Sequence, residues 1–305
     1  MTGRITNSMI SRSVLADLND VSTRLAKTQR KLSSGKEITR PSDDPYGTSR
    51  ALTMRASLES SRQYQRNVGE AIGWQEVTDV ALSKMSDTVL RVRELVVQGA
   101  SDSAGKTARE AIASEIDKLV ESLKQEANAS YSGRYVFSGT DTDVRPYTVG
   151  GPDTFAGNTS PVAREIGPGV SVQVNVVAKD ILGDGQGPPG DSLLLDVLRD
   201  VTQHLRGGTV TDLNALRTTD LKALSTNLDD LSKVRATVGA TTNRLETADA
   251  RLQEVEASTT KLLSDVEDAD MAKTMVDYSM QQSIYQSALH SGANIVQASL
   301  LDFLR

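Results

Sequence analysis

The residues that could carry out chemistry are few and far apart in this sequence. Cysteine is absent, and there are only two histidines, His204 and His290. Without cysteine there is no thiol nucleophile and no thiolate metal ligand, and two distant histidines outside an HExxH spacing give little support to a zinc site. We interpret both histidines as ordinary helix positions. The sequence therefore predicts no metal ion and no other cofactor.

Two clusters of acidic residues, Asp43-Asp44 and Glu267-Asp268-Ala269-Asp270, are the next candidates. A catalytic acid–base pair needs two carboxyl groups in unlike environments, and a calcium loop needs ligands at alternating positions with a bidentate glutamate. Neither cluster has such a pattern. We expect the first cluster to cap a helix that begins at Pro45, and the second to place negative charge at a helix N-terminus.

The glycine-rich segments do not have the spacing of a phosphate-binding loop. The segment from Gly183 to Gly190 lacks the lysine and the following helix start that such loops require. Ser132 and Ser138 lack the G-x-S-x-G context of a nucleophile elbow. We therefore expect a structural or assembly role and no enzymatic activity. The alternative from another class is an enzyme or ligand-binding module within residues 139–190.

Composition and charge favour long, thin helices over the wide core of a compact enzyme. The 305-residue chain has 4% aromatic residues and a net charge of −6. Thin helices bury one stripe each, and a negative charge disfavours nucleic-acid binding. No segment approaches the ~20 apolar residues of a membrane helix, and the first residues lack the apolar stretch of a signal peptide. We expect no nucleic acid, no membrane insertion and no cleaved signal peptide.

A narrow apolar strip organises the first part of the chain. Its residues alternate four and three positions apart, which is typical of a helix that packs against one partner helix. They are Val14, Leu18, Val21, Leu25, Thr28 and Leu32. Gly35 is expected to end this helix in a left-handed C-cap, and a connector from Lys36 to Pro45 follows. A helix with a single strip needs a partner from elsewhere in the chain or from another chain.

The last part of the chain has the same four-and-three spacing. The positions are Met271, Met275, Tyr278, Gln282, Tyr285, Leu289, Gly292, Val296, Ser299 and Phe303. Residues 1–66 carry twelve basic and six acidic side chains, whereas residues 265–305 carry two basic and six acidic ones. Opposite charges favour contact between the two ends, within or between subunits, and two separately solvated helix faces are the alternative.

Long helical patterns with one interruption define the predicted fold. Residues 139–190 hold six of the eight prolines and ten of the 22 glycines, which breaks any long helix. Within them, a period-two run over Val170–Val176 predicts a strand that forms a hairpin with Val162–Ile166. We predict a mainly α fold with a β-rich insertion, as a long antiparallel helical bundle or rod with terminal coiled-coil segments. Its expected parts are an N-terminal coiled coil and connector (1–45), two rod halves (46–138 and 191–264), the insertion (139–190) and a C-terminal coiled coil (265–305).

Motifs at both ends of the chain resemble the bacterial flagellin superfamily. One is Leu32-Ser-Ser-Gly-Lys-Glu-Ile-Thr-Arg-Pro-Ser-Asp-Asp-Pro45, and the other is Val266-Glu-Asp-Ala-Asp-Met271 with the Gln281-Gln282 … Leu300-Leu-Asp-Phe-Leu-Arg305 ending. Within this superfamily, Pro41-Ser-Asp-Asp-Pro45 and Gly133-Arg-Tyr-Val-Phe-Ser-Gly-Thr140 resemble the hook-associated members more than the filament subunit. The insertion matches no part of the family pattern, as expected of an outward-facing variable region.

The resemblance implies an extracellular axial protein of the flagellum, exported unfolded by the flagellar type III apparatus with an export chaperone. Copies would form a ring between a preceding hook-associated axial protein and flagellin; the alternative is flagellin itself, the filament subunit. The terminal segments are expected to be disordered in the monomer and to fold on assembly, where burial offsets the ordering entropy. The expected assembly residues are Val14, Leu18, Val21, Leu25, Leu32, Pro41, Asp43, Asp44, Pro45, Met271, Met275, Tyr278, Tyr285, Leu289, Val296 and Phe303.

Overall fold

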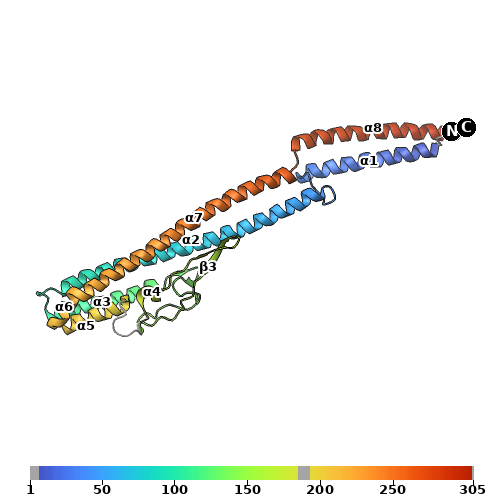
Figure 1. Cartoon of the computed structure of the whole chain (residues 1–305). Coiled ribbons are helices and arrows are strands. Elements are labelled where there is room, and N and C mark those ends of the chain that lie inside the picture. The colour runs from blue at the N-terminus through green and yellow to red at the C-terminus, as the bar shows by residue number, and fades with distance from the viewer. Residues whose placement is uncertain (1–6, 185–192, 304–305) are drawn as a thin grey trace. The chain divides into compact units, whose positions relative to one another are not determined.

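Helices dominate the computed structural model, which describes residues 7–184 and 193–303 (Figure 1). The side chains of residues 7, 8, 10, 11 and 294–303 lie outside the described part. The long helices are α1 (Asn7–Ser34), α2 (Pro45–Gly99), α3 (Lys106–Ala127), α5 (Leu194–Gly207), α7 (Leu221–Glu267) and α8 (Met271–Phe303). Shorter elements are α4 (Lys179–Leu182), α6 (Val210–Ala215) and a π-helical turn (Leu216–Asp220). The predicted mainly α class is confirmed.

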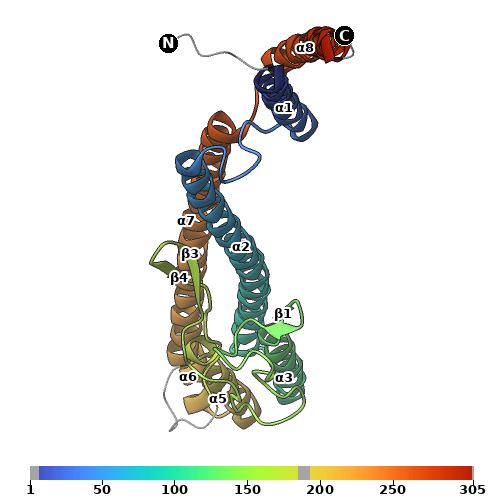
Figure 2. The ribbon, with the colours of Figure 1, turned by 90° about the vertical axis from the view of Figure 1, so that its right-hand side faces the viewer.

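The chain divides into two compact units. One consists of Met1–Ser60 and Val255–Arg305, and the other of Ser61–Glu254. In the first unit α1 and α8 lie side by side, as both ribbon views show (Figures 1 and 2). Residues 139–190, the expected insertion, belong to the second unit.

Helices α2 and α7 pack antiparallel in the second unit. Arg235 on α7 donates to Asp79 on α2 with an Nε–Oδ1 distance of 3.0 Å. Towards the other end, the Ser61 hydroxyl lies 3.5 Å from the carbonyl oxygen of Leu252. The residue numbers of the contacting positions therefore rise along α2 as they fall along α7. The predicted antiparallel arrangement is confirmed.

One apolar core joins four helices of the second unit. Because α3 and α5 are amphipathic, each turns one apolar stripe towards this core. Fully buried members are Leu82, Met85, Val89 and Val96 of α2, Ile116 and Leu123 of α3, Leu198 and Val201 of α5, and Leu224 and Leu231 of α7. Gly208 caps α5 with a φ of 61°, in the left-handed region that glycine allows.

The insertion is less rich in strands than predicted. The expected hairpin is confirmed as β3 (Ala163–Gly167) paired antiparallel with β4 (Val170–Gln173). A second, two-residue hairpin, β1 (Ser130–Tyr131) with β2 (Arg134–Tyr135), precedes the insertion. Elsewhere in residues 139–184 the described backbone forms α4 and otherwise irregular loops. The mainly α fold with a β insertion is confirmed, and the insertion has few strands because prolines cannot donate to a strand ladder and the many glycines weaken strands.

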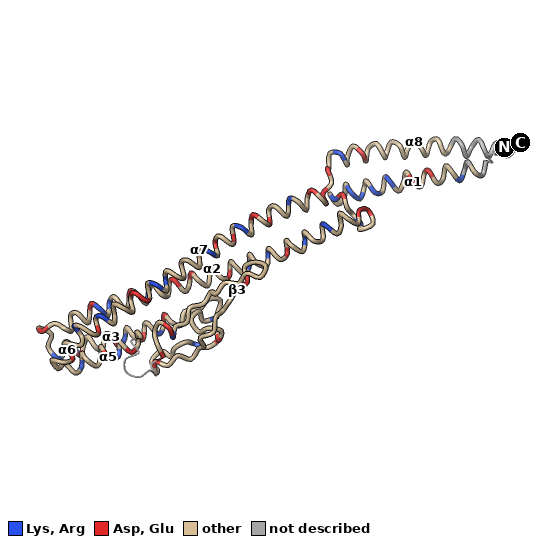
Figure 3. Tube along the Cα trace, in the orientation of Figure 1, with Lys and Arg blue, Asp and Glu red and all other residues tan. Residues whose placement is uncertain are grey.

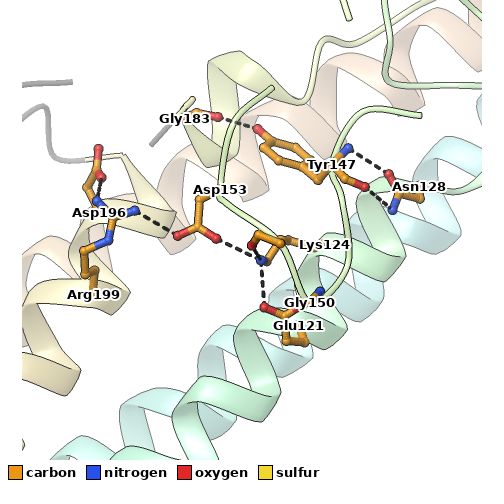
Figure 4. A network of polar contacts seen from close by, with 10 residues as sticks. Glu121, Lys124, Asn128, Tyr147, Gly150, Asp153, Gly183, Asp196 and Arg199 are labelled. Carbon is orange, nitrogen blue, oxygen red and sulfur yellow. Dashed lines mark hydrogen bonds and ion pairs between the residues drawn. The ribbon is translucent and has the colours of Figure 1, made fainter. Parts of the chain in front are cut away.

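Side chains from the helices hold the irregular part of the insertion in place (Figure 4). Lys124 on α3 has a side chain only 1% exposed, and its Nζ lies 2.9 Å from Asp153 and 2.7 Å from Glu121. Burial disfavours the charged form of Lys124, but the hydrogen bonds and charges of Glu121 and Asp153 outweigh it and raise the pKa of the amine. Asn128 bonds both the N–H and the carbonyl of Tyr147, at 3.0 and 2.8 Å. The insertion is therefore anchored by polar contacts to α3.

The β3–β4 hairpin packs on α2 and α7. Ile166, Val172 and Val174 form a small apolar cluster with Val68 of α2 and Leu245 of α7. Two α2 amides complete the contact, because Asn67 donates to the Glu165 carbonyl at 2.8 Å and Gln75 donates to the Val174 carbonyl at 3.0 Å.

Two glycines of α2, four residues apart, have different surroundings. A Cβ built on Gly69 would meet nothing within 4 Å. A Cβ on Gly73 would lie 2.7 Å from the Tyr131 hydroxyl and 2.9 Å from its ring. Glycine at position 73 therefore lets Tyr131 lie directly on the helix, whereas Gly69 has no such packing role.

Replacing these two glycines by alanine should change stability in opposite directions. Gly69→Ala is expected to raise the free energy of unfolding by about 0.5–1 kcal/mol, the usual advantage of alanine inside a helix. Gly73→Ala is expected to lower it, because the Tyr131 ring must move away. Urea unfolding of the two variants and the wild type measures this, and equal stabilisation by both substitutions would contradict the tight packing at Gly73.

Candidate assembly interface

Two connectors in the first unit pair through their backbones. They are the turn after α1 and the short link between α7 and α8. Glu37 donates its N–H to the Glu267 carbonyl at 2.7 Å, and Ala269 donates to the Gly35 carbonyl at 2.9 Å. These bonds form an antiparallel bridge between Lys36 and Asp268, which are 232 positions apart in the sequence. Gly35 has a φ of 68°, in the left-handed region, and so ends α1 as the predicted C-cap. This turn lets the two connectors lie next to each other.

Opposite charges reinforce this bridge. The Lys36 Nζ lies 2.5 Å from Asp268 and 3.8 Å from Glu267. Arg55 of α2 also forms an ion pair with Glu267, whose side chain is 9% exposed. The predicted attraction between the basic first segment and the acidic last segment is thereby confirmed at the connectors.

The acidic residues before α8 do not act together as predicted. Glu267 is the last residue of α7, so the interpretation that it lies at a helix N-terminus was wrong. Asp270 alone takes that role, since its Oδ1 accepts the Lys273 N–H at 3.1 Å. The difference arises because Lys36 and Arg55 form ion pairs with Glu267, and Lys36 also forms one with Asp268, so both acidic side chains belong to the bridge between the connectors.

Asp43 and Asp44 shape the turn that leads into α2. Asp44 accepts the Gly47 N–H at 2.9 Å and so caps the helix that begins at Pro45, as predicted. Asp43 accepts the Thr39 hydroxyl at 2.9 Å and forms an ion pair with Lys27 at 3.1 Å. The Thr39 hydrogen bond and then the Lys27 amine lower the pKa of Asp43 to about 2. Pro41 and Pro45 are exposed on this turn.

The predicted strip on α1 is the face turned towards a partner. Its six positions are all half-buried, and most of their neighbours on the helix are exposed. These positions are Val14, Leu18, Val21, Leu25, Thr28 and Leu32. The partner is α8: a Cβ on the buried Gly292 would lie 3.1 Å from Val14 and 3.4 Å from Leu18. The small residue on α8 thus allows α1 to approach closely.

The predicted strip on α8 is partly out of register. Tyr278 and Tyr285 are half-buried on the side of Gly292, as expected. Met271, Met275 and Leu289 are 47%, 62% and 44% exposed, so they do not pack on α1 of the same chain, and their place in an interface with other subunits stays a prediction. The less exposed positions at matching spacing are Thr274, Gln281 and Ala288. Val296 and Phe303 have side chains outside the described residues.

The register was ambiguous because α8 carries apolar side chains on several faces. Lys273, Asp277 and Asp302 are its only Lys, Arg, Asp or Glu residues, and most of its path in Figure 3 is uncharged. Its exposed large apolar side chains are Met271, Met275, Val276, Met280, Ile284 and Leu289. A helix that is apolar all round is normally covered on all sides. Periodicity therefore gave no unique strip. Thr274 and Gln281 are polar and Ala288 is small, so these positions gave little apolar signal by which to find them.

Comparison with known proteins assigns the chain to a family. Residues 5–142 match the bacterial flagellin N-terminal helical region, and residues 221–304 match the bacterial flagellin C-terminal helical region. The chain belongs to the bacterial flagellin family. The first match includes α1 and α2, and the second includes α7 and α8, so together they cover the helices of the first unit. The segment between the two matches contains the β3–β4 hairpin.

Relatives include both hook-associated and filament proteins. The chain is 24% identical to flagellar hook-associated protein 3 of Escherichia coli K12, over 97% of this chain and 98% of that protein. It is 28% identical to flagellin of Bacillus subtilis 168, over 99% and 100%. The solved structure of flagellar hook associated protein-3 from Legionella pneumophila has the same fold, with a TM-score of 0.59 and 15% identity over 70% of this chain and 99% of that one.

Neither a membrane segment nor a metal cluster is found in the part of the chain that the structure describes. No helix there combines the length and apolar character needed to cross a membrane. No group of three or more histidine, cysteine, aspartate or glutamate side chains there is arranged to hold a metal ion.

The turn before α2 should be sensitive to acid in a defined range. Because Asp43 has a lowered pKa when folded, the unfolded chain takes up the proton first, so the contribution of this contact to stability is complete above the unfolded pKa of ~3.9. It should be lost as the pH falls towards the folded value of about 2. The protection factor of the Arg40 amide, which donates to Asp43, should stay constant from pH 7 to about 4 and should then fall as the pH approaches 2.

Two variants test that assignment. Asp43→Ala should remove the protection of the Arg40 amide at every pH, because it removes the acceptor. Asp17→Asn, at an exposed position of α1, should leave it unchanged. An NMR titration in which the Asp43 carboxyl protonates at its ordinary pKa would contradict the Thr39 and Lys27 contacts.

Proposed function

We propose that this protein is a structural subunit of the bacterial flagellum, with the role of hook-associated protein 3 as adaptor at the hook–filament junction. The observation that carries the assembly role is α8, whose apolar side chains point to several sides while its extensive contact is with α1. Full burial of one such Met, Leu or Ile side chain contributes about 1.5–3 kcal/mol. Neighbouring subunits are the natural source of that burial.

The terminal segments should gain much of their order from assembly. The exposed side of α1 also carries large apolar residues, with Met9 57% and Leu15 66% exposed. An isolated helix pair of this kind leaves much apolar area in water. In the monomer, burial therefore contributes little favourable free energy to offset the entropy lost when the two helices become ordered. In the assembled structure, copies of α1 and α8 would cover one another through these residues, together with the turn from Pro41 to Pro45.

The proposal implies a set of partners. They are other copies of this chain in a ring, a preceding hook-associated axial protein on one side and flagellin on the other. Before assembly the chain would pass unfolded through the flagellar type III export apparatus, held by an export chaperone, and then be located outside the cell. The resemblance of Pro41–Pro45 and Gly133–Thr140 to hook-associated members supports the junction role.

The second candidate function is flagellin, the filament subunit itself. The 28% identity to the Bacillus subtilis protein named flagellin supports it. The two functions differ in the amount of protein needed, because a filament contains many subunits and a junction ring contains few.

Deletion of the gene separates the two functions. If the chain is the junction adaptor, the mutant should secrete flagellin monomers into the medium and build no filaments, and the protein should be a trace component of sheared wild-type filaments. If it is the filament subunit, it should dominate those filaments. Filaments of normal length on the deletion mutant would exclude the junction role.

Removing the terminal helices tests their role in assembly. A chain that lacks residues 1–32 and 271–305 should stay folded and monomeric and should not assemble. Unfolding would show that these helices belong to the monomer's own core.

A single substitution on α8 tests the proposed contact between subunits. Met275→Glu in the full chain should reduce incorporation about tenfold or more, because it places a charge where the assembly would bury an apolar side chain. Gln286→Glu, at an exposed polar position of the same helix outside the predicted strip, is the matched control. Equal incorporation of both variants would contradict the assignment of Met275 to the interface.

A further inference from the structure

A pocket of about 470 Å³ lies in the second unit, apart from the terminal helices. Its walls come from α2, from the β1–β2 turn and from the β3–β4 hairpin. The residues that matter for its chemistry are Glu70, Trp74, Tyr131, Ser132, Arg134 and Arg164. None of the contacts described for the assembly interface involves them.

Two arginines of this pocket lack partners. Among the described residues, neither Arg134 of β2 nor Arg164 of β3 has a side-chain hydrogen bond or ion pair, unlike Arg199, Arg206 and Arg235 of the same unit. Guanidinium groups bind carboxylates through paired N–H donors. Glu70 also lines the pocket without an ion pair among the described residues, so the lining carries a net single positive charge. The pocket thus has unused capacity for one anionic group.

An aromatic corner lies beside these arginines. Trp74 is 4% exposed, and its indole N–H is buried without a hydrogen-bond acceptor in the described structure. A buried indole N–H usually finds an acceptor. Tyr131 stands edge-on to Trp74, with ring centroids 6.4 Å apart and an interplanar angle of 69°. The pocket therefore combines the edge of Trp74, with its unpaired buried indole N–H, and the Tyr131 ring with the two guanidinium groups.

The turn that brings these groups together is strained. Ser132 has a φ of 50°, the only positive value of a non-glycine residue in the described chain, and Gly133 follows with 80°. Positive φ at both central residues is the pattern of a tight hairpin turn, and it places Tyr131 directly opposite Arg134. A serine is disfavoured in this conformation, and such residues concentrate at ligand sites.

We propose that this pocket binds a small aromatic carboxylate, with the carboxylate between Arg134 and Arg164 and the ring against Trp74 and Tyr131. The pocket lies in the size range of ~300–1,000 Å³ that is usual for small-molecule sites, and a single acidic side chain of a neighbouring subunit would fill only part of it. A bound molecule would connect α2 with both hairpins. This site is independent of the assembly role and does not rest on it.

Trp74 reports directly on the pocket because it is the only tryptophan in the chain. The test is a fluorescence titration of the full-length protein with benzoate as the probe, and with benzamide and inorganic phosphate as separate arms. Benzoate should give a saturable change and should raise the thermal unfolding midpoint. Benzamide, which has the ring without the charge, and phosphate, which has the charge without the ring, should each bind at least tenfold more weakly.

Four variants complete the test. Arg134→Gln and Arg164→Gln should each raise the dissociation constant of benzoate about tenfold, as the loss of one charged contact predicts. Arg66→Gln is the matched control, because Arg66 is exposed on α2 and donates to Gln63 outside the pocket. Each variant should keep the wild-type circular dichroism spectrum. If Arg134→Gln or Arg164→Gln is destabilised, Arg134→Lys serves instead; it keeps the positive charge and should retain part of the affinity for benzoate.

Several results would overturn the proposal. Folded wild-type protein without a saturable benzoate signal has no such site. Equal binding of benzamide would show an uncharged aromatic pocket, and equal binding of phosphate would show a general anion site. A Trp74 signal that changes with protein concentration alone would identify a second copy of the chain as the occupant.

Discussion

Burial of apolar surface between helices from opposite ends of the chain is the interaction on which both units depend. In one unit α2 packs against α7, and in the other α1 packs against α8. The contacting positions are separated widely in the sequence, as in the 156 positions between Asp79 and Arg235. Neither end of the chain can therefore bury its apolar faces alone. Such pairing closes a long loop of the chain. The entropic cost of closing this loop is offset only when both helices of a pair have formed and packed together.

Polar contacts then determine how these helices are aligned. The backbone bridge between Lys36 and Asp268 brings the end of α1 to the start of α8. The buried Glu267 strengthens it through Arg55 and Lys36. In the second unit, Lys124 does the same for the insertion, because it ties Asp153 to α3. Apolar faces supply most of the stability in this arrangement, and charged pairs supply the register.

The two terminal helices differ in how many partners they require. α1 has one half-buried strip, and its remaining positions are mostly polar or charged apart from residues such as the exposed Met9 and Leu15, which suits fewer neighbours. α8 has apolar side chains on several faces and few charges, which suits a helix surrounded by others. A subunit that exposes such a helix is suited to an assembly in which neighbouring copies complete the core.

Local patterns were sufficient for much of the fold and for part of the interface. The α1 strip, the Gly35 cap, the Asp44 cap and the β3–β4 hairpin were predictable, because each depends on residues close in the sequence. The role of Glu267 and the register of α8 were not. Glu267 is surrounded by cations from distant segments, and an apolar pattern that covers several faces of a helix does not specify which face meets a given partner.

The amino-acid sequence by itself determined the helices, their ends and the family motifs, since capping, helix periodicity and turn formation are local. Tertiary structure alone decided which helix faces meet, that the insertion is mostly irregular loop held by Lys124 and Asn128, and that Arg134 and Arg164 line one pocket with Trp74. The physical reason is that these contacts join segments far apart in the chain, and their partners are specified only when the helices pack.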